Sequence, residues 1–374
     1  MLLVNISKKS HFLFILLFFL LSCAEDSVND VDNPDSNSCI ENADTAFQSL
    51  ISLYWDNNRK IFYSTNNKNE NLNYWWQAHG LDALVDASIR VGDERHFKMI
   101  SDFYNGIGNA NNGFINDYYD DMAWMGIAFV RAYSITNIKK YLDTSIQLWN
   151  DMLTGWNLTH GGGIAWNKNM LNYKNTPSNA TTAILSFRLY NITGEQKYFD
   201  LGEKIMNWLT NTLVDEESGM VWDGIGRNGT NTIDYDWLFT YNQGIYIGAC
   251  VEYYTISKNE IWRYRAIKTA DKAIVSFNGI SNILKDEGEG DGGLFKGILI
   301  RYLKYLADQP FLDESKNSIY KAYIRNNAEI LWKYGKSPSF PYMFNHDWTT
   351  GPSGEIDLSV QLSGVFLIEA CAGT

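Results

Sequence analysis

Residues 116–127 read NDYYDDMAWMGI, in which a glycine is followed by a branched apolar residue inside a run with helical spacing of its apolar side chains. The same pairing of a small residue with a branched one recurs at intervals of 46 to 67 residues. The six pairs are Gly80-Leu81, Gly126-Ile127, Ala183-Ile184, Gly244-Ile245, Gly297-Ile298 and Gly364-Val365. Each interval leaves room for one further helix, so the chain is predicted to repeat a pair of helices six times.

More amphipathic segments fill those intervals and are the expected partners of the glycine-containing helices. They cover roughly residues 43–54, 96–105, 139–153, 196–213, 260–277 and 314–334. A glycine inside a helix costs about 1 kcal/mol relative to alanine, so five at equivalent places indicate a close approach of neighbouring backbones. The sequence predicts an all-α fold, an (α/α)6 toroid of six inner and six outer helices over residues 43–374. A helical solenoid is the alternative, but its repeats would be more uniform in length.

The composition excludes several classes of protein. Of the 374 residues, 45% are hydrophobic and only six are prolines, which argues against a disordered chain. The net charge of −12 argues against a nucleic-acid partner, because phosphate groups would be repelled. Aromatic residues make up 15% of the chain and suit either a large core or stacking against sugars. We expect the protein to be a monomer.

The N-terminal residues are expected to direct the protein to a membrane. Two lysines precede an apolar run over residues 12–21, which is too short to span a bilayer, so residues 1–22 are predicted to be a signal peptide. The run ends in Leu-Leu-Ser-Cys23, which resembles a bacterial lipobox and predicts lipidation of Cys23; an ordinary signal peptide is the alternative. Residues 23–42 are predicted to be a flexible acidic tether, and their start resembles surface-export signals of Bacteroidetes lipoproteins. These features predict an outer-membrane lipoprotein facing the surface or the periplasm.

The sequence gives no reason to expect a crosslink, a metal or a cofactor. Cys39, Cys250 and Cys371 are odd in number and widely spaced, so we predict neither a disulfide framework nor a zinc site. The five histidines have no metal-binding spacing. Residues 286–293 resemble a calcium loop only superficially, because a glycine stands at the third position. We predict that they form a flexible loop that delivers Asp291.

Asp120 and Asp121 are the strongest candidates for chemistry. The inner helices of a toroid run in one direction, so their N-terminal ends meet at one mouth, and Asn116 or Asp117 would cap the helix that carries the pair. Acids in a first turn often only complement the helix dipole. Two adjacent acids, however, lie about 100° apart around a helix, so one must face the axis or a neighbouring helix. Their proximity also drives their proton affinities apart, as glycoside cleavage requires.

Two pairings of carboxyl groups remain open. Adjacent acids most easily reach the separation of about 5–5.5 Å used by retaining glycosidases, whereas inverting enzymes use about 6.5–9.5 Å. Asp291 stands on the inner helix opposite in the ring, and its pairing with Asp120 or Asp121 would predict inversion.

Aromatic and polar side chains in the segments leading into successive inner helices could stack on a sugar or hydrogen-bond to it. The predicted substrate contacts are Trp75, Trp76, Tyr119, Trp124, Asn179, Tyr241, Asn242, Asp291, His346 and Trp348. Each alone is more often a packed loop anchor or a cap, but their concentration on one rim favours a glycan groove. Two other hypotheses share this rim: a surface protein that binds glycans without cutting them, and another (α/α)6 carbohydrate-active enzyme that uses Asp291.

Six motifs lie in the segments around the inner helices: YYDDMAW (118–124), GGGIAW (161–166), KNTPSNA (174–180), YNQG (241–244), DGGLFKG (291–297) and QLSG (361–364). In these motifs the chain resembles glycoside hydrolase family 76, the α-1,6-mannanases, over nearly its whole length from about residue 43. The resemblance implies an (α/α)6 fold and endo-acting, retaining cleavage of α-1,6-linked mannose backbones, in polysaccharides or oligosaccharides. It also implies that Asp120 is the nucleophile and Asp121 the acid/base.

Overall fold

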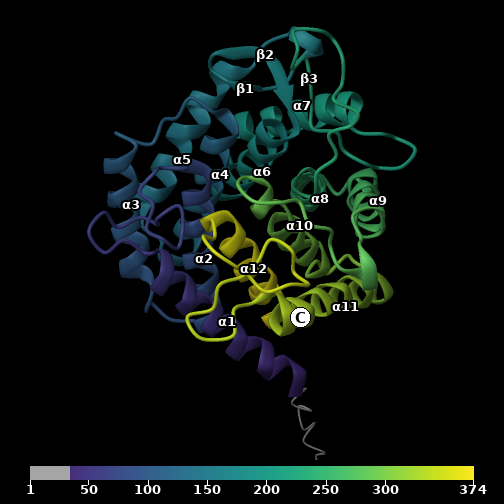
Figure 1. Cartoon of the computed structure of the whole chain (residues 1–374). Coiled ribbons are helices and arrows are strands. Elements are labelled where there is room, and N and C mark those ends of the chain that lie inside the picture. Colours follow the sequence, from purple (N-terminus) through teal and green to yellow (C-terminus); the bar gives the residue numbers. More distant parts are fainter. Residues whose placement is uncertain (1–33) are drawn as a thin grey trace, which may run out of the picture. The chain divides into compact units, whose positions relative to one another are not determined.

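The computed structural model describes residues 34–374, which form twelve α-helices that alternate between an inner and an outer position (Figure 1). The inner helices are α2 (Tyr74–Val91), α4 (Tyr119–Thr136), α6 (Thr176–Thr193), α8 (Thr240–Ser257), α10 (Gly292–Ala307) and α12 (Leu358–Ala372). The outer helices are α1 (Pro34–Tyr54), α3 (Phe97–Ala110), α5 (Lys139–Met152), α7 (Gln196–Leu213), α9 (Glu260–Ser276) and α11 (Glu314–Ile330). Short 3-10 turns lie at Leu153–Gly155, Thr159–Gly161 and Ile280–Asn282, and a π-helical turn at Leu331–Gly335 follows α11.

The inner helices form a closed ring. Each packs against the inner helix on either side, and α12 packs back against α2. The outer helices cover this ring, with α1 packed mainly on α12 and α7 on α6. A closed ring confirms the predicted (α/α)6 toroid and is incompatible with an open solenoid. Within residues 34–374, none of the helices has both the length and the apolar character needed to cross a membrane.

The first helix differs from its prediction. It begins at Pro34 rather than near residue 43, so the predicted tether is wrong for residues 34–42, which are helical. The signal peptide, Cys23 and the rest of the tether lie outside the described residues. The polar sequence of residues 34–42 does not indicate a packed helix, and α1 is instead stabilised by its tertiary contact with α12.

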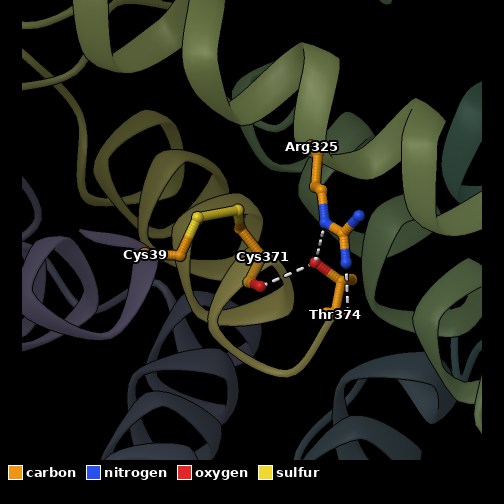
Figure 2. The surroundings of a disulfide bond; sticks show 4 residues. All are labelled: Cys39, Arg325, Cys371 and Thr374. Carbon is orange, nitrogen blue, oxygen red and sulfur yellow. Dashed lines mark hydrogen bonds between the residues drawn. A yellow bond between two sulfur atoms is a disulfide. The ribbon is translucent and has the colours of Figure 1, made fainter. Parts of the chain in front are cut away.

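A disulfide between Cys39 and Cys371 ties α1 to α12, with 5.8 Å between the Cα atoms (Figure 2). This bond corrects the prediction that the cysteines do not pair. The two residues are 332 positions apart, so only closure of the ring brings them together. Beside them, Arg325 of α11 donates a hydrogen bond from Nε to Oγ1 of Thr374 (3.1 Å), which secures the C-terminal residue (Figure 2).

The helix glycines permit close approaches of two kinds. A Cβ added to Gly244 would lie 2.8 Å from Cα of Leu299, and one added to Gly297 would lie 2.6 Å from Cα of Ser363. These two positions confirm the predicted approach of neighbouring backbones. At the other three glycines the neighbour is a side chain: Phe62 for Gly80, Leu185 for Gly126 and Phe344 for Gly364.

Side-chain amides hold the loops that lead into the mouth. They occupy the fourth position of four inner helices: Gln77, Asn179, Gln243 and Gln361. Each accepts from a backbone N–H and donates to a backbone carbonyl of the preceding loop. Gln243, for example, accepts from the N–H of Val221 (2.9 Å) and donates to its carbonyl (2.8 Å). The loops therefore enter the mouth in fixed positions.

A small antiparallel sheet joins two of these loops. Its strands are β1 (Ala165–Asn167), β2 (Met170–Asn175) and β3 (Gly224–Ile225), in that order. Asn175 pairs with Gly224, and the N–H of Thr176 donates to the carbonyl of Asp223 (2.7 Å). The sheet thus brings Asn175 and Asp223 to the same side of the mouth.

At the opposite end of the ring, partly buried charges pair between inner helices. Arg131 of α4 binds Asp82 and Asp86 of α2, and Arg301 of α10 binds Asp86. Burial would raise the pKa of Asp86, but the two guanidinium groups lower it to about 2. These ion pairs join α4 and α10 to α2 at the end of the ring away from the mouth.

Candidate active site

A cavity of about 560 Å³ opens where the N-terminal ends of the inner helices meet. Its lining comes from the loops before α2, α4, α6, α8 and α10 and from the first turns of those helices, and not from the loop between α11 and α12. Six predicted site residues line it: Trp75, Asp120, Asp121, Trp124, Tyr241 and Asp291. Further aromatic rings in the lining are Tyr74, Tyr118, Trp166, Tyr173, Trp237, Phe239 and Phe295. The structure therefore brings the acidic pair and part of the predicted aromatic rim together at one cavity.

The acidic pair lies in the first turn of α4. Tyr118 precedes the helix in an extended conformation, so Asp120 and Asp121 are its second and third residues. Neither of the predicted caps holds this helix end. Asn116 instead accepts a hydrogen bond from the N–H of Tyr118 (2.9 Å), which shapes the turn before the helix, and Asp117 is exposed.

Asp120 is held in one orientation by two hydrogen bonds. Its Oδ1 accepts from the N–H of Asp121 (3.0 Å), and its Oδ2 accepts from Nδ2 of Asn175 (3.3 Å). The residue is only 8% exposed, and this burial raises the pKa of Asp120 to about 7, although both hydrogen bonds favour the ionised form.

Asp121 has the higher proton affinity of the pair. Burial raises the pKa of Asp121 well above its ordinary value, and the negative charges of Asp120 and Asp291 raise it further. The two adjacent carboxyls titrate together, so one proton is shared between them near neutral pH. Asp120 is the group that ionises first, and Asp121 retains the proton. This is the division that a nucleophile and a general acid need.

Asp291 lies across the cavity at the start of α10. Its Oδ1 accepts from Nε1 of Trp75 (2.9 Å) and from Nε1 of Trp76 (3.0 Å). The loop before it is not free, because Oε1 of Glu287 accepts from the N–H of Thr240 at the start of α8 (3.0 Å). The predicted flexible delivery loop is thus anchored, and Asp291 has a defined position.

Sequence reasoning missed Asp223, a buried acid beside the pair. Its Oδ1 accepts from the hydroxyl of Tyr241 (3.1 Å) and from Nδ2 of Asn242 (3.0 Å). Its Oδ2 accepts from the hydroxyl of Tyr173 (2.8 Å) and from Nη2 of Arg227 (2.6 Å). The available signal was its place directly after an aromatic residue in a loop leading into an inner helix. Arg227 also lines the cavity and had no comparable signal.

Four predicted contacts lie behind the cavity wall and do not line it. Trp76 holds Asp291, and Asn242 holds Asp223. The hydroxyl of Tyr119 is bonded to Thr154, and the amide of Asn179 to the backbone of Ile164. All four are buried and bind protein partners, so they support the site and do not line it.

The last two predicted contacts are also displaced from the cavity. His346 lies in the loop between α11 and α12, with its Nδ1 2.8 Å from Oδ1 of Asp286. Trp348 is 1% exposed, and the ammonium group of Lys296 sits 4.2 Å from its ring centroid. We correct both predictions, because this loop packs beside the acidic loop and contributes nothing to the cavity lining.

A pair of adjacent carboxyls with divided proton affinities, held among aromatic rings at the mouth of an (α/α)6 toroid, defines a glycoside hydrolase. The chain belongs to glycosyl hydrolase family 76, whose family profile matches residues 38–372. The resemblance seen in the sequence is therefore confirmed.

Two solved structures and one curated relative illustrate the similarity. The GH76A alpha-1,6-mannanase from Salegentibacter sp. HEL1_6 is 40% identical, with 89% of this chain and 99% of that chain covered and a TM-score of 0.86. An inactive variant of it, with two consecutive aspartates replaced by alanine, is solved in complex with alpha-1,6-mannotetrose; it is 39% identical, covers 89% and 98%, and has a TM-score of 0.86. Mannan endo-1,6-alpha-mannosidase DCW1 of Candida albicans is 30% identical over 56% of this chain. The chain spans about half the length of that relative, 50%.

Proposed function

We propose that the protein is a retaining, endo-acting glycoside hydrolase that cleaves α-1,6-mannosidic bonds in mannan backbones. The observation that carries the proposal is the adjacent pair Asp120 and Asp121 at the cavity, one poised to ionise and the other to stay protonated. The family and the names of its relatives support the substrate class. The substrate is a neutral polysaccharide, which agrees with an acidic protein surface that makes no use of charge attraction.

The reaction runs in two displacements. In the first, ionised Asp120 attacks the anomeric carbon and forms an ester bond while the glycosidic C–O bond breaks and Asp121 gives its proton to the leaving oxygen. In the second, water attacks the same carbon while Asp121 takes its proton, and the ester bond to Asp120 breaks. Two inversions leave the product with the anomeric configuration of the substrate. Loss of the charge on Asp120 in the ester also lowers the proton affinity of Asp121, which suits its change from acid to base.

The test uses Asp120→Asn and Asp121→Asn with debranched mannan as substrate. Both variants should lose about 10³-fold or more in turnover, whereas Asp117→Asn, an exposed acid outside the cavity, should retain wild-type activity. Near-wild-type turnover in either active-site variant would contradict the assignment.

Azide rescue separates the two roles. With an activated aryl α-mannoside, the acid-deficient Asp121→Ala variant should form the α-mannosyl azide, because azide replaces water in the second displacement. The nucleophile-deficient Asp120→Ala variant should form only the β-azide by a single displacement. The reverse pattern would exchange the assigned roles.

The competing functions give different outcomes in the same assays. A glycan-binding protein would retain mannan without producing shorter oligosaccharides. An enzyme that pairs Asp291 with the acidic pair would release product of inverted configuration, which proton NMR during the first minutes of reaction detects. Both are less favoured, because adjacent acids suit the short separation of retaining enzymes.

We also propose that the protein is an outer-membrane lipoprotein that acts as a monomer. The support is the signal-like run and the Leu-Leu-Ser-Cys23 motif of the sequence. Replacement of Cys23 by serine should abolish labelling with a fatty-acid probe and release the protein from the membrane fraction. Light scattering of the soluble part, residues 34–374, should give the mass of one chain. Membrane retention without Cys23 would contradict the anchor.

A further inference from the structure

Trp237 is an exposed ring at the edge of the cavity. It lies in the loop between β3 and α8, lines the cavity, and is 43% exposed. Its backbone already fixes the loop, since its N–H donates to the carbonyl of Asp234 (3.0 Å) and its carbonyl accepts from the N–H of Asp223 (3.1 Å). The indole packs edge-on against the ring of Phe239, with 5.8 Å between the centroids, and still leaves much of its surface exposed. A large aromatic side chain left exposed beside a cavity suits a ligand contact.

Arg227 holds this indole from behind. Its guanidinium carbon lies 3.7 Å from the ring centroid of Trp237, so one face of the indole is covered. The guanidinium is itself fixed, because Nη2 binds Asp223 (2.6 Å) and Nε binds Asp234 (3.0 Å). Its other neighbour is the ring of Tyr173, whose centroid lies 4.5 Å away. The free face of Trp237 is thus a platform whose orientation is set before any ligand arrives, which lowers the entropic cost of binding.

The positions of the two catalytic carboxyls indicate on which side of the cavity each part of the substrate lies. Asp120 lies on the side of the loop that carries Trp237, because Asn175, which donates to its Oδ2 (3.3 Å), pairs in the sheet with Gly224. Asp121 is the next residue of α4, and the charge of Asp291, across the cavity, acts on it. The step from Asp120 to Asp121 therefore leads away from the loop that carries Trp237. Since Asp121 protonates the leaving oxygen, the leaving part of the chain lies on its side. The glycone part, which includes the non-reducing end, then lies toward Trp237.

We propose that Trp237, backed by Arg227, is a distal glycone subsite that stacks on a mannopyranose ring at least one unit before the residue attacked by Asp120. The inference rests on the proposed function and extends it to the choice of the bond that is cut. A pyranose ring presents a face of C–H groups that packs on an indole without consuming its hydroxyl hydrogen bonds. A chain long enough to reach the platform gains this contact, and a short one does not.

The experiment compares Trp237→Ala, Trp237→Phe and the matched control Tyr235→Ala on an α-1,6-mannohexaose labelled at its reducing end. Tyr235 is an aromatic residue of the same loop that is 55% exposed and does not line the cavity. Trp237→Ala should lower kcat/KM on the hexaose by about tenfold, with little change on an aryl mannoside. Trp237→Phe should restore most of the loss, and Tyr235→Ala should resemble the wild type.

The lengths of the labelled products decide the side of the subsite. Loss of a glycone contact lets the chain slide so that fewer units occupy that side, and the labelled products of Trp237→Ala should become longer. Unchanged products, or shorter ones, would overturn the inference. If the wild-type protein cuts no mannan, the proposed function fails, and calorimetric binding of the uncut hexaose still tests the platform. Equal affinity of the wild type and Trp237→Ala would then reject it.

Discussion

Replacing Asp120 by asparagine should stabilise the folded protein above pH 7. In the unfolded chain this carboxyl ionises near its ordinary pKa of 3.8, whereas burial raises the pKa of Asp120 to about 7 in the folded protein. Ionisation of Asp120 therefore destabilises the folded protein relative to the unfolded chain. This effect is absent below about pH 4 and complete above about pH 7. Since each tenfold change in proton affinity is worth about 1.36 kcal/mol, the difference between the folded and unfolded states amounts to roughly 4 kcal/mol.

The asparagine also weakens the hydrogen bond to Asn175, because two amides then replace an amide and a carboxylate, and this subtracts about 1 kcal/mol. We expect a net gain of about 3 kcal/mol at pH 8 and no gain at pH 4. Urea unfolding at the two pH values measures both, and Asp117→Asn, an exposed acid before the same helix, should change the stability little at either pH. Equal stability of Asp120→Asn and the wild type at pH 8, or the same gain at pH 4, would refute the argument from burial.

Three further predictions follow from the helix ends and the packing. The acid limb of the kcat/KM profile should lie near pH 7, where the nucleophile Asp120 ionises. Asn175→Ser should move this limb to higher pH, because the variant removes the amide donor to Asp120 while its hydroxyl can still cap the helix. An unmoved limb would contradict this. Gly297→Ala should lower the free energy of unfolding by about 2–3 kcal/mol, because the added methyl group would clash with the backbone of α12. Gly126→Ala should lower it by less, because the methyl group there meets a flexible side chain that can move. Equal losses in urea unfolding would contradict this distinction. Cys371→Ser should lower the free energy of unfolding by up to about 5 kcal/mol, because the disulfide with Cys39 closes a very long loop. A reductant should destabilise the wild type and leave this variant unaffected.

The sequence was sufficient for those features that depend on local spacing. The alternation of glycine-containing and amphipathic segments predicted the order of the helices, and α7 begins and ends where the apolar pattern does, at Gln196 and Leu213. The adjacent acids Asp120 and Asp121 were recognisable because a helix fixes the angle between neighbours. The position of Asp291 at the cavity was also foreseeable, because this residue precedes an inner helix and all inner helices begin at the same mouth.

The same reasoning failed where a residue's role depends on partners distant in the chain. Trp348 and Trp237 both stand in loops before inner helices, yet one is covered by Lys296 and the other faces the cavity. The number and type of residues in a loop do not specify which way the loop folds over the ring. The side-chain amides at the fourth positions of the inner helices and the small sheet make that choice through contacts with the preceding loops, and the loop sequences alone do not specify those contacts.

The sequence by itself thus determined a ring of twelve helices with an acidic pair at its mouth, since helical periodicity and turn residues are local properties. Tertiary structure alone decided that Asn175 and Asp223 flank Asp120, that Arg227 lies behind Trp237, and that the first helix is crosslinked to the last. These contacts join residues from different repeats, and their distances are set only when the ring closes and water leaves the space between the loops. The proton affinities of the pair depend on that exclusion of water, so they too belong to the folded protein.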